Sequence, residues 1–193
     1  MWWFLLDARA LELSASDDGE LGAALTQAIA QPGDHVVFVA PGTYTEERTL
    51  TAGLAGRVRI RPMPQAEAPV VFQADRGDDG FFLVDGNVIL ELHGVEIDGM
   101  GQSRAARVVN GGGLDILFSY VHDTHSNNGG GAVAVGAGSF VFASESLFEG
   151  STAARGGFFS GTTADAQINL RRTTLRRGTA TSGGGGAIES LGS

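Results

Sequence analysis

The segment 121–128 holds the densest group of reactive side chains in the sequence and reads Val-His-Asp-Thr-His-Ser-Asn-Asn. His122 and His125 stand three residues apart and flank Asp123. Imidazole and carboxylate groups transfer protons in acid–base catalysis and also ligate metal ions. A repeat pattern aligns Asp98 with His122 one coil earlier, and stacked strands lie about 4.8 Å apart. The predicted catalytic residues are therefore His122, Asp123, Asp98 and His125.

Two other interpretations of this segment stay open. Asn127 and Asn128 favour left-handed backbone conformations at turns. The segment is then a corner of the fold, and its polar side chains form a hydrogen-bonded ladder with no catalytic role. In the third interpretation the two histidines and the carboxylate hold a metal ion.

A second group of reactive residues is acidic. Asp75, Asp78 and Asp79 are crowded into one short segment, and Asp85 follows nearby. Carboxylates on a turn are the oxygen ligands that calcium prefers, although their spacing here differs from that of an EF-hand loop. The sequence predicts calcium ligands at Asp75, Asp78 and Asp79, with a solvated acidic loop as the alternative. No other cofactor is expected.

Arginine is concentrated near the C-terminus. Residues 151–193 hold five arginines against two acidic residues, whereas the whole chain carries a net charge of −9. Arginine matches the geometry of carboxylate and sulfate groups, so this region is a candidate site for an anionic polysaccharide, or a solvated outer face. The candidate ligand-binding residues are Arg171, Arg172, Arg176 and Arg177.

Composition excludes several classes of function. The 193 residues include no Cys, and all 13 basic residues are Arg. Disulfide frameworks, cysteine zinc sites and lysine Schiff-base chemistry are therefore excluded. The net charge of −9 argues against a nucleic-acid partner. The N-terminal apolar run, residues 1–6, is too short for the apolar region of a signal peptide or for a membrane span.

Short apolar segments recur with a period of 24 to 28 residues from residue 90 onward. The four units are Leu90, Leu92, Ile97 and Val108-Val109; Leu114, Ile116, Val121 and Ala132-Val133; Phe140, Phe142, Leu147 and Phe158-Phe159; and Ile168, Leu170, Leu175 and Ala187-Ile188. Each unit has three strand-like pieces and no room for a helix, which predicts an all-β parallel β-helix of about five to six coils. This alignment places Asp123, Glu149 and Arg177 on successive coils and predicts an ion pair between Glu149 and Arg177.

The N-terminal region differs from the repeats. Asp17 and Glu20 form a helix-capping pattern, and apolar residues follow at helical spacing until Pro32-Gly33. We expect a helix over residues 18–31 that covers the N-terminal end of the solenoid. One domain is predicted over 1–193, with a strand and capping helix in 1–35 and coils in 36–193. We expect this domain to be part of a longer chain, with end-to-end contact at an uncapped last coil.

The segment from Leu21 to Tyr44 contains Ala-Ile-Ala-Gln-Pro-Gly-Asp-His-Val-Val-Phe-Val-Ala-Pro-Gly-Thr-Tyr. It resembles the opening of right-handed parallel β-helix proteins of the pectin-lyase-like superfamily, and this resemblance implies that the predicted β-helix is right-handed. In the later units, Ser146-Leu-Phe-Glu-Gly150 leads to Gly-Gly-Phe-Phe, and Gly-Gly-Ala-Ile follows in the last unit. These units are similar to repeats of polymorphic outer-membrane proteins and adhesin-like β-helices. This resemblance implies an extracellular or cell-surface location.

Catalytic motifs of the superfamily are missing. Arg59-Ile-Arg61-Pro lacks the second arginine of a pectate-lyase site, and Asp78-Asp79 is the only match to a polygalacturonase motif. We therefore expect a non-catalytic, adhesin-like module that binds carbohydrate, either a polysaccharide or a cell-surface glycan, or another surface. The alternatives are a polysaccharide lyase or glycoside hydrolase acting on acidic polysaccharide, and a structural spacer or incomplete gene product.

Overall fold

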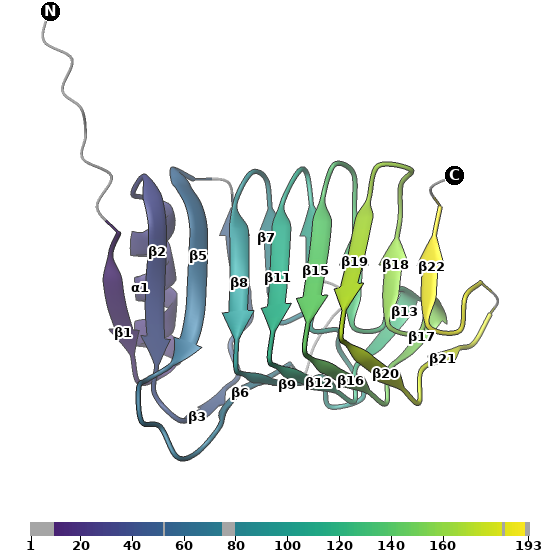
Figure 1. Ribbon diagram of the computed structural model, residues 1–193, viewed down its shortest axis with the longest axis horizontal. Coiled ribbons are helices and arrows are strands. Elements are labelled where there is room, and N and C mark those ends of the chain that lie inside the picture. The colour runs from purple at the N-terminus through teal and green to yellow at the C-terminus, as the bar shows by residue number, and fades with distance from the viewer. Residues whose placement is uncertain (1–9, 52, 75–79, 183, 192–193) are drawn as a thin grey trace, which may run out of the picture.

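The protein is a parallel β-solenoid, as the repeats predict. The computed structural model describes residues 10–51, 53–74, 80–182 and 184–191. Each coil contributes one strand to each of three long sheets, and strands in the same sheet pair in parallel with those of the neighbouring coils. Figure 1 shows the coils stacked side by side from the N-terminal to the C-terminal end. The core runs through the middle of this stack.

The first long sheet, called sheet A here, has seven strands. In spatial order they are β1 (Glu12–Ala15), β2 (Gly33–Val39), β5 (Ala55–Pro62), β8 (Ile89–His93), β11 (Gly113–Leu117), β15 (Phe140–Ser144) and β19 (Gln167–Arg171). Sheet A faces the viewer in Figure 1.

Two six-stranded sheets and one short sheet complete the coils. Sheet B contains β3 (Gly42–Tyr44), β6 (Val70–Gln73), β9 (Glu96–Asp98), β12 (Tyr120–His122), β16 (Leu147–Glu149) and β20 (Thr174–Arg176). Sheet C contains β4 (Arg48–Thr51), β7 (Phe82–Asp85), β10 (Ala106–Val109), β14 (Val133–Val135), β18 (Phe159–Gly161) and β22 (Ile188–Ser190). Sheet D contains β13 (His125–Gly129), β17 (Thr152–Arg155) and β21 (Thr179–Ala180).

The core is built from side chains that alternate along each strand. In β11, Leu114 and Ile116 point inward and are fully buried. They stack on Leu90 and Leu92 of the preceding coil. Because every strand is in parallel register with the next, the inward rows join into one continuous apolar interior. Aromatic side chains also fill this interior, among them Phe72, whose ring lies 5.1 Å from those of Phe81 and Phe82.

The predicted helix is confirmed as α1 (Asp18–Ile29). The Asp17 carboxylate accepts a hydrogen bond from the Glu20 N–H at 2.8 Å, which is the expected N-cap. Leu21 and Leu25 are buried with two alanines of the same face. The helix contacts β1, β2, β4 and β5 at the N-terminal end of the solenoid. The chain continues into β2 directly after Pro32, where the helix cannot be extended.

The sequence alignment of the third unit was wrong by one residue. Val141 and Ala143, rather than Phe140 and Phe142, stack on Leu114 and Ile116. Phe148, rather than Leu147, stacks on Val121. Both faces of these short strands carry apolar residues, so hydrophobicity alone does not set their register, and a shift of one residue exchanges the faces.

Two other predicted alignments are also wrong in register. Val108 pairs with Val135, and Ala106 with Val133, because a longer connection containing β13 precedes β14. The predicted charge row of Asp123, Glu149 and Arg177 is also wrong in register. Glu149 pairs instead with His122 on one side and with Arg176 on the other. The predicted ion pair between Glu149 and Arg177 is nevertheless present.

From β8 onward, each corner between sheets A and B has one residue with a left-handed backbone. Gly94 occupies this position after β8, with φ of 68°. The next three coils place Phe118, Glu145 and Arg172 there, with φ of 51°, 52° and 47°. These conformations turn the chain sharply and direct the three side chains outward in a row along the solenoid. The row forms one wall of the groove described below.

Candidate functional site

The predicted catalytic segment lies on the outer face of sheet B. Pairing of β9 with β12 places Asp98 directly beside His122, as the sequence predicts. Gln73 of β6 precedes Asp98 in the same row, and Glu149 of β16 follows His122. Because side chains alternate along a strand, this row points away from the core. The solenoid thus brings together polar residues that are 24 to 27 positions apart in the sequence.

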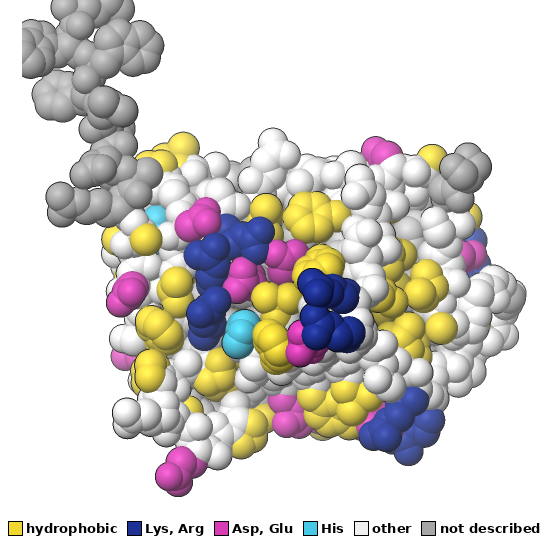
Figure 2. Space-filling view, viewed as in Figure 1, with side chains coloured by type: hydrophobic (Ala, Val, Ile, Leu, Met, Phe, Trp, Pro, Cys, Tyr) yellow, Lys and Arg dark blue, Asp and Glu magenta, His cyan; other side chains and the backbone are white. Residues whose placement is uncertain are grey.

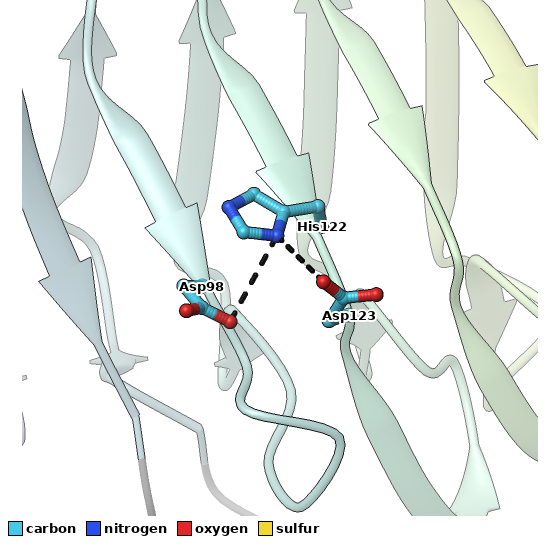
Figure 3. Close-up of side chains that lie close together, drawn as sticks. All are labelled: Asp98, His122 and Asp123. Carbon is cyan, nitrogen blue, oxygen red and sulfur yellow. Dashed lines mark hydrogen bonds and ion pairs between the residues drawn. The ribbon is translucent and has the colours of Figure 1, made fainter.

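His122 is surrounded by three carboxylates. Its Nε2 lies 3.0 Å from Oε1 of Glu96, and its Nδ1 lies 3.0 Å from Oδ2 of Asp123. Oδ1 of Asp98 is 3.8 Å from the same Nδ1. Figure 3 shows the Asp98 and Asp123 carboxylates facing one ring nitrogen of His122. Both ring nitrogens therefore face negative charge.

Backbone features orient the two aspartates. Oδ1 of Asp98 accepts a hydrogen bond from the Met100 N–H at 2.8 Å, which fixes the carboxylate against the loop that follows β9. Asp123 has φ of 47°, a left-handed conformation that aspartate tolerates better than most residues. This conformation turns its side chain back toward His122. Gly150 stands beside Asp123 on the next coil, where an added Cβ would lie 2.8 Å from Oδ1 of Asp123.

The carboxylates change the acidity of His122. Burial acts to lower the pKa of the imidazole, but hydrogen bonds to Asp123 and Glu96 and the charge of Asp98 outweigh it, so the pKa is raised. A raised pKa favours the imidazolium, which suits an acid or a cation-holding group better than a general base. The ring also stacks on Tyr120, with centroids 4.5 Å apart. The imidazole is thus held rigidly from three sides.

His125 does not join this cluster. It lies on β13, beyond the corner that follows His122, and its Nε2 is 3.4 Å from Oδ1 of Asn127. The structure therefore brings together three of the four predicted catalytic residues, and it adds Glu96, which the sequence analysis missed. Glu96 stands two positions before Asp98 on the same strand face, and this spacing was the available signal. The predicted calcium ligands Asp75, Asp78 and Asp79 lie outside the described residues.

The four arginines of the predicted binding stripe lie on different surfaces. Arg171 is at the end of β19 in sheet A, and Arg172 occupies the next corner. Arg172 lies 3.5 Å from Glu145. Arg176 and Arg177 both contact the Glu149 carboxylate, and this contact lowers the pKa of Glu149. Three of the four guanidinium groups are therefore already paired with carboxylates of the chain.

A groove of about 640 Å³ runs along the corner between sheets A and B. Its lining residues come from five consecutive coils and include aromatic, polar and charged groups. They are Pro69, Gly94, Val95, Glu96, Phe118, Ser119, Tyr120, Glu145, Ser146, Leu147, Arg172 and Thr174. Phe118 is 54% exposed although it is a large apolar residue. Glu96 and Tyr120 line the groove and also contact His122, so the groove and the His122 cluster are neighbours.

A second charged cluster covers part of the outer face of sheet A. Glu91 is buried and contacts three arginines of β5, at 2.9 to 3.2 Å. These arginines are Arg57, Arg59 and Arg61. Arg57 also donates a hydrogen bond to the buried Asp115. Figure 2 shows basic and acidic side chains gathered over this part of sheet A.

The two carboxylates of this cluster differ in acidity. Burial raises the pKa of Asp115 more than Arg57 lowers it. Burial also acts to raise the pKa of Glu91, but hydrogen bonds to the three arginines outweigh it, and this pKa is lowered. The sequence analysis missed the cluster. Its signal was the alternation of arginine with apolar residues in 57–61, which places all three arginines on one face of a strand.

Comparison with known proteins assigns no function to this chain, so its function is inferred from the geometry of the site. Within the described residues, no helix is both long and apolar enough to cross a membrane. No protein-family model matches the sequence, and no curated protein matches it significantly.

Proposed function

We propose that this chain is a carbohydrate-binding module of an extracellular or cell-surface protein, and that the groove between sheets A and B holds the glycan. The observation that carries the proposal is the exposed Phe118 ring in a groove built from successive coils. An aromatic ring offers a flat apolar surface at low entropic cost, and the C–H face of a sugar ring packs against such a surface. Tyr120 adds a second aromatic group to the same wall.

The shape of the groove fits an extended chain. Its walls are built from equivalent positions of successive coils, which lie about 4.8 Å apart. Ser119 and Ser146 occupy equivalent positions on neighbouring coils, and Oγ of Ser146 accepts a hydrogen bond from the Ser119 N–H at 3.1 Å. An extended polymer can contact several successive coils along the groove. A small globular ligand does not use this repetition.

The charges of the groove favour a neutral glycan over an anionic one. Glu96 and Glu145 face the groove together with one cation, Arg172, which is paired with Glu145. An anionic sugar therefore meets no unpaired cation among the residues that line the groove. Hydroxyl groups, by contrast, both donate to carboxylates and accept from guanidinium groups.

An array of neutral and acidic oligosaccharides, probed with the purified chain, tests this proposal. We expect binding to neutral chains that is lost in Phe118→Ala and retained in Phe140→Ala. Phe140 is the matched control because it is a partly exposed aromatic residue on sheet A that does not line the groove. Binding that survives Phe118→Ala, or no binding to any glycan, contradicts the proposal. No binding together with no turnover supports a structural spacer instead.

The cluster on sheet A favours a second candidate function, an enzyme acting on acidic polysaccharide. Arg57, Arg59 and Arg61 gather on this face, where each contacts Glu91, and the neighbouring Asp115 combines a raised pKa with burial. Perturbed carboxyl groups beside cations are typical of acid–base sites. Ultraviolet detection of unsaturated products and a reducing-end assay would measure lyase and hydrolase activity on polyuronates.

Two variants separate the possible catalytic sites. Activity lost in Asp115→Asn and kept in His122→Ala assigns catalysis to sheet A. The reverse result assigns it to His122 and Asp98 on sheet B, as the sequence analysis predicted. No activity in the unmodified protein rejects the enzymatic function.

A further inference from the structure

The carboxylates of Asp98 and Asp123 lie close to Nδ1 of His122, and a cation between these three groups would be stabilised. Glu96 accepts a hydrogen bond from Nε2 at 3.0 Å, which fixes the ring proton on that nitrogen. In the neutral ring, Nδ1 then presents a lone pair toward Oδ2 of Asp123 at 3.0 Å and Oδ1 of Asp98 at 3.8 Å. Three electron-rich atoms then converge on one point, and their repulsion is removed either by a second ring proton on Nδ1 or by a metal ion bound in place of that proton.

The separations of these three atoms fit a transition-metal site. One ligand atom from each of Asp98, His122 and Asp123 lies within 4.8 Å of the other two. In a tetrahedral zinc site with bonds of about 2.1 Å, neighbouring ligand atoms are about 3.4 Å apart. The two Nδ1–oxygen distances, 3.0 and 3.8 Å, lie on either side of this value. Both distances are therefore close to the separation of two ligand atoms on one metal ion.

The surroundings of His122 resemble the second shell of a metal site. Ligating histidines usually donate their other ring N–H to a carboxylate, which fixes the tautomer and orients the ring. Glu96 makes this contact here, and Tyr120 holds the ring by stacking. Asp98 is itself anchored by the Met100 N–H. These contacts order the site before an ion arrives, which lowers the entropic cost of binding.

We propose that Asp98, His122 and Asp123 bind one divalent transition-metal ion of the zinc type, with Nδ1 of His122 as the nitrogen ligand. Imidazole with two carboxylates suits Zn²⁺ better than Ca²⁺ or Mg²⁺, which prefer oxygen ligands alone. The Asp123 side chain is 66% exposed, so an ion reaches the site directly from solvent. Three protein ligands leave at least one coordination position open toward water or another ligand.

Isothermal titration of the chelator-treated chain with ZnCl₂ tests this proposal, with MnCl₂ and CaCl₂ titrated in parallel. We expect one Zn²⁺ per chain and weaker binding of Ca²⁺. Asp98→Asn and Asp123→Asn should each weaken Zn²⁺ binding by at least about tenfold. Asparagine keeps the oxygen that accepts from Met100 at position 98, and it tolerates a left-handed backbone at position 123. Both variants therefore remove charge while preserving the local fold.

His125→Ala is the matched control, because His125 lies nearby in the sequence but outside the cluster. It should bind Zn²⁺ as the unmodified chain does. Nitrogen NMR of the imidazoles should show a large shift of Nδ1 of His122 on addition of Zn²⁺. No saturable Zn²⁺ binding overturns the proposal. So does binding that survives both aspartate substitutions, or binding that is lost equally in His125→Ala.

Glu96 is a positioning residue in this proposal. Glu96→Ala should weaken Zn²⁺ binding by about 10- to 100-fold, whereas Glu96→Gln should restore most of it, because its amide oxygen still accepts from Nε2. Equal loss in both variants would mean that Glu96 acts through its charge rather than through its hydrogen bond. The metal site stands independently of the glycan proposal, since the titration contains no carbohydrate.

Discussion

Asp98 and His122 occupy the same register position on adjacent coils, where β9 pairs with β12. Their side chains consequently lie side by side on the outer face of sheet B, with Oδ1 of Asp98 3.8 Å from Nδ1 of His122. In a parallel solenoid, residues one repeat apart become spatial neighbours. A functional group can therefore be assembled from single residues of several repeats, and its geometry depends on register.

The register of the third unit is tested by two neighbouring residues. Phe148 is fully buried and its ring lies 4.9 Å from that of Phe159, whereas Leu147 points outward. Phe148→Ala should lower the free energy of unfolding by about 3–5 kcal/mol. Leu147→Ala should cost less than about 1 kcal/mol, as is usual for surface positions. Urea denaturation followed by circular dichroism measures both, and equal losses would contradict the register.

Gly150 holds space for the Asp123 side chain. Its φ of 66° disfavours any other residue, and a Cβ would approach Oδ1 of Asp123 to 2.8 Å. Gly150→Ala should destabilise the fold by about 1–2 kcal/mol through the backbone and should also displace Asp123. Gly101→Ala is the control, because its φ is 65° and a Cβ there has no neighbour within 4 Å. Only Gly150→Ala should also weaken Zn²⁺ binding, and similar Zn²⁺ affinities in the two variants would argue against this role of Gly150.

Glu91 should make stability depend on pH on the acid side. Burial opposes its ionisation, but Arg57, Arg61 and Arg59 lower its pKa below the usual value of 4.5 in the folded state. The ionised form therefore stabilises the fold above pH 4.5, and this contribution is lost as the pH falls through the folded-state pKa.

The variant Glu91→Gln removes this contribution. It should cost about 1–3 kcal/mol at pH 7, since buried charged partners lose their pairing, and it should flatten the decrease in melting temperature below pH 4.5. Thermal unfolding between pH 3 and pH 7 measures this. An unchanged acid-side slope in Glu91→Gln would show that other groups control the acid denaturation.

The N-cap of α1 contributes a separate part of the stability. Asp17 accepts from the Glu20 N–H at the start of the helix. Asp17→Ala should lower the free energy of unfolding by about 1 kcal/mol, while Asp17→Asn keeps an acceptor and should cost much less. Chemical denaturation compares the two. If the two variants lose the same stability, charge rather than capping is responsible.

The repeats in the sequence determine most of the fold. Three short apolar pieces per unit, with no helical period after residue 40, leave few architectures other than a parallel solenoid. The capping residues Asp17 and Glu20 predicted the helix because capping is a local interaction. The pairing of Asp98 with His122 followed in the same way, since the first two apolar pieces of the second unit repeat those of the first unit after 24 residues.

Two kinds of feature were decided only by the tertiary structure. The first depends on a register shift of one residue, and the second on contacts between side chains of different coils. The segment Phe140–Ala143 is apolar on both faces, so packing against Leu114 and Ile116 had to select which face is buried. The left-handed corner at Asp123 turns its carboxylate back toward Nδ1 of His122, and no sequence pattern gives that direction. Likewise, Glu91 becomes an ion-pair centre only because β5 and β8 pair in one register. Apolar periodicity fixes which elements stack, whereas side-chain direction at corners and across strands arises from contacts between coils.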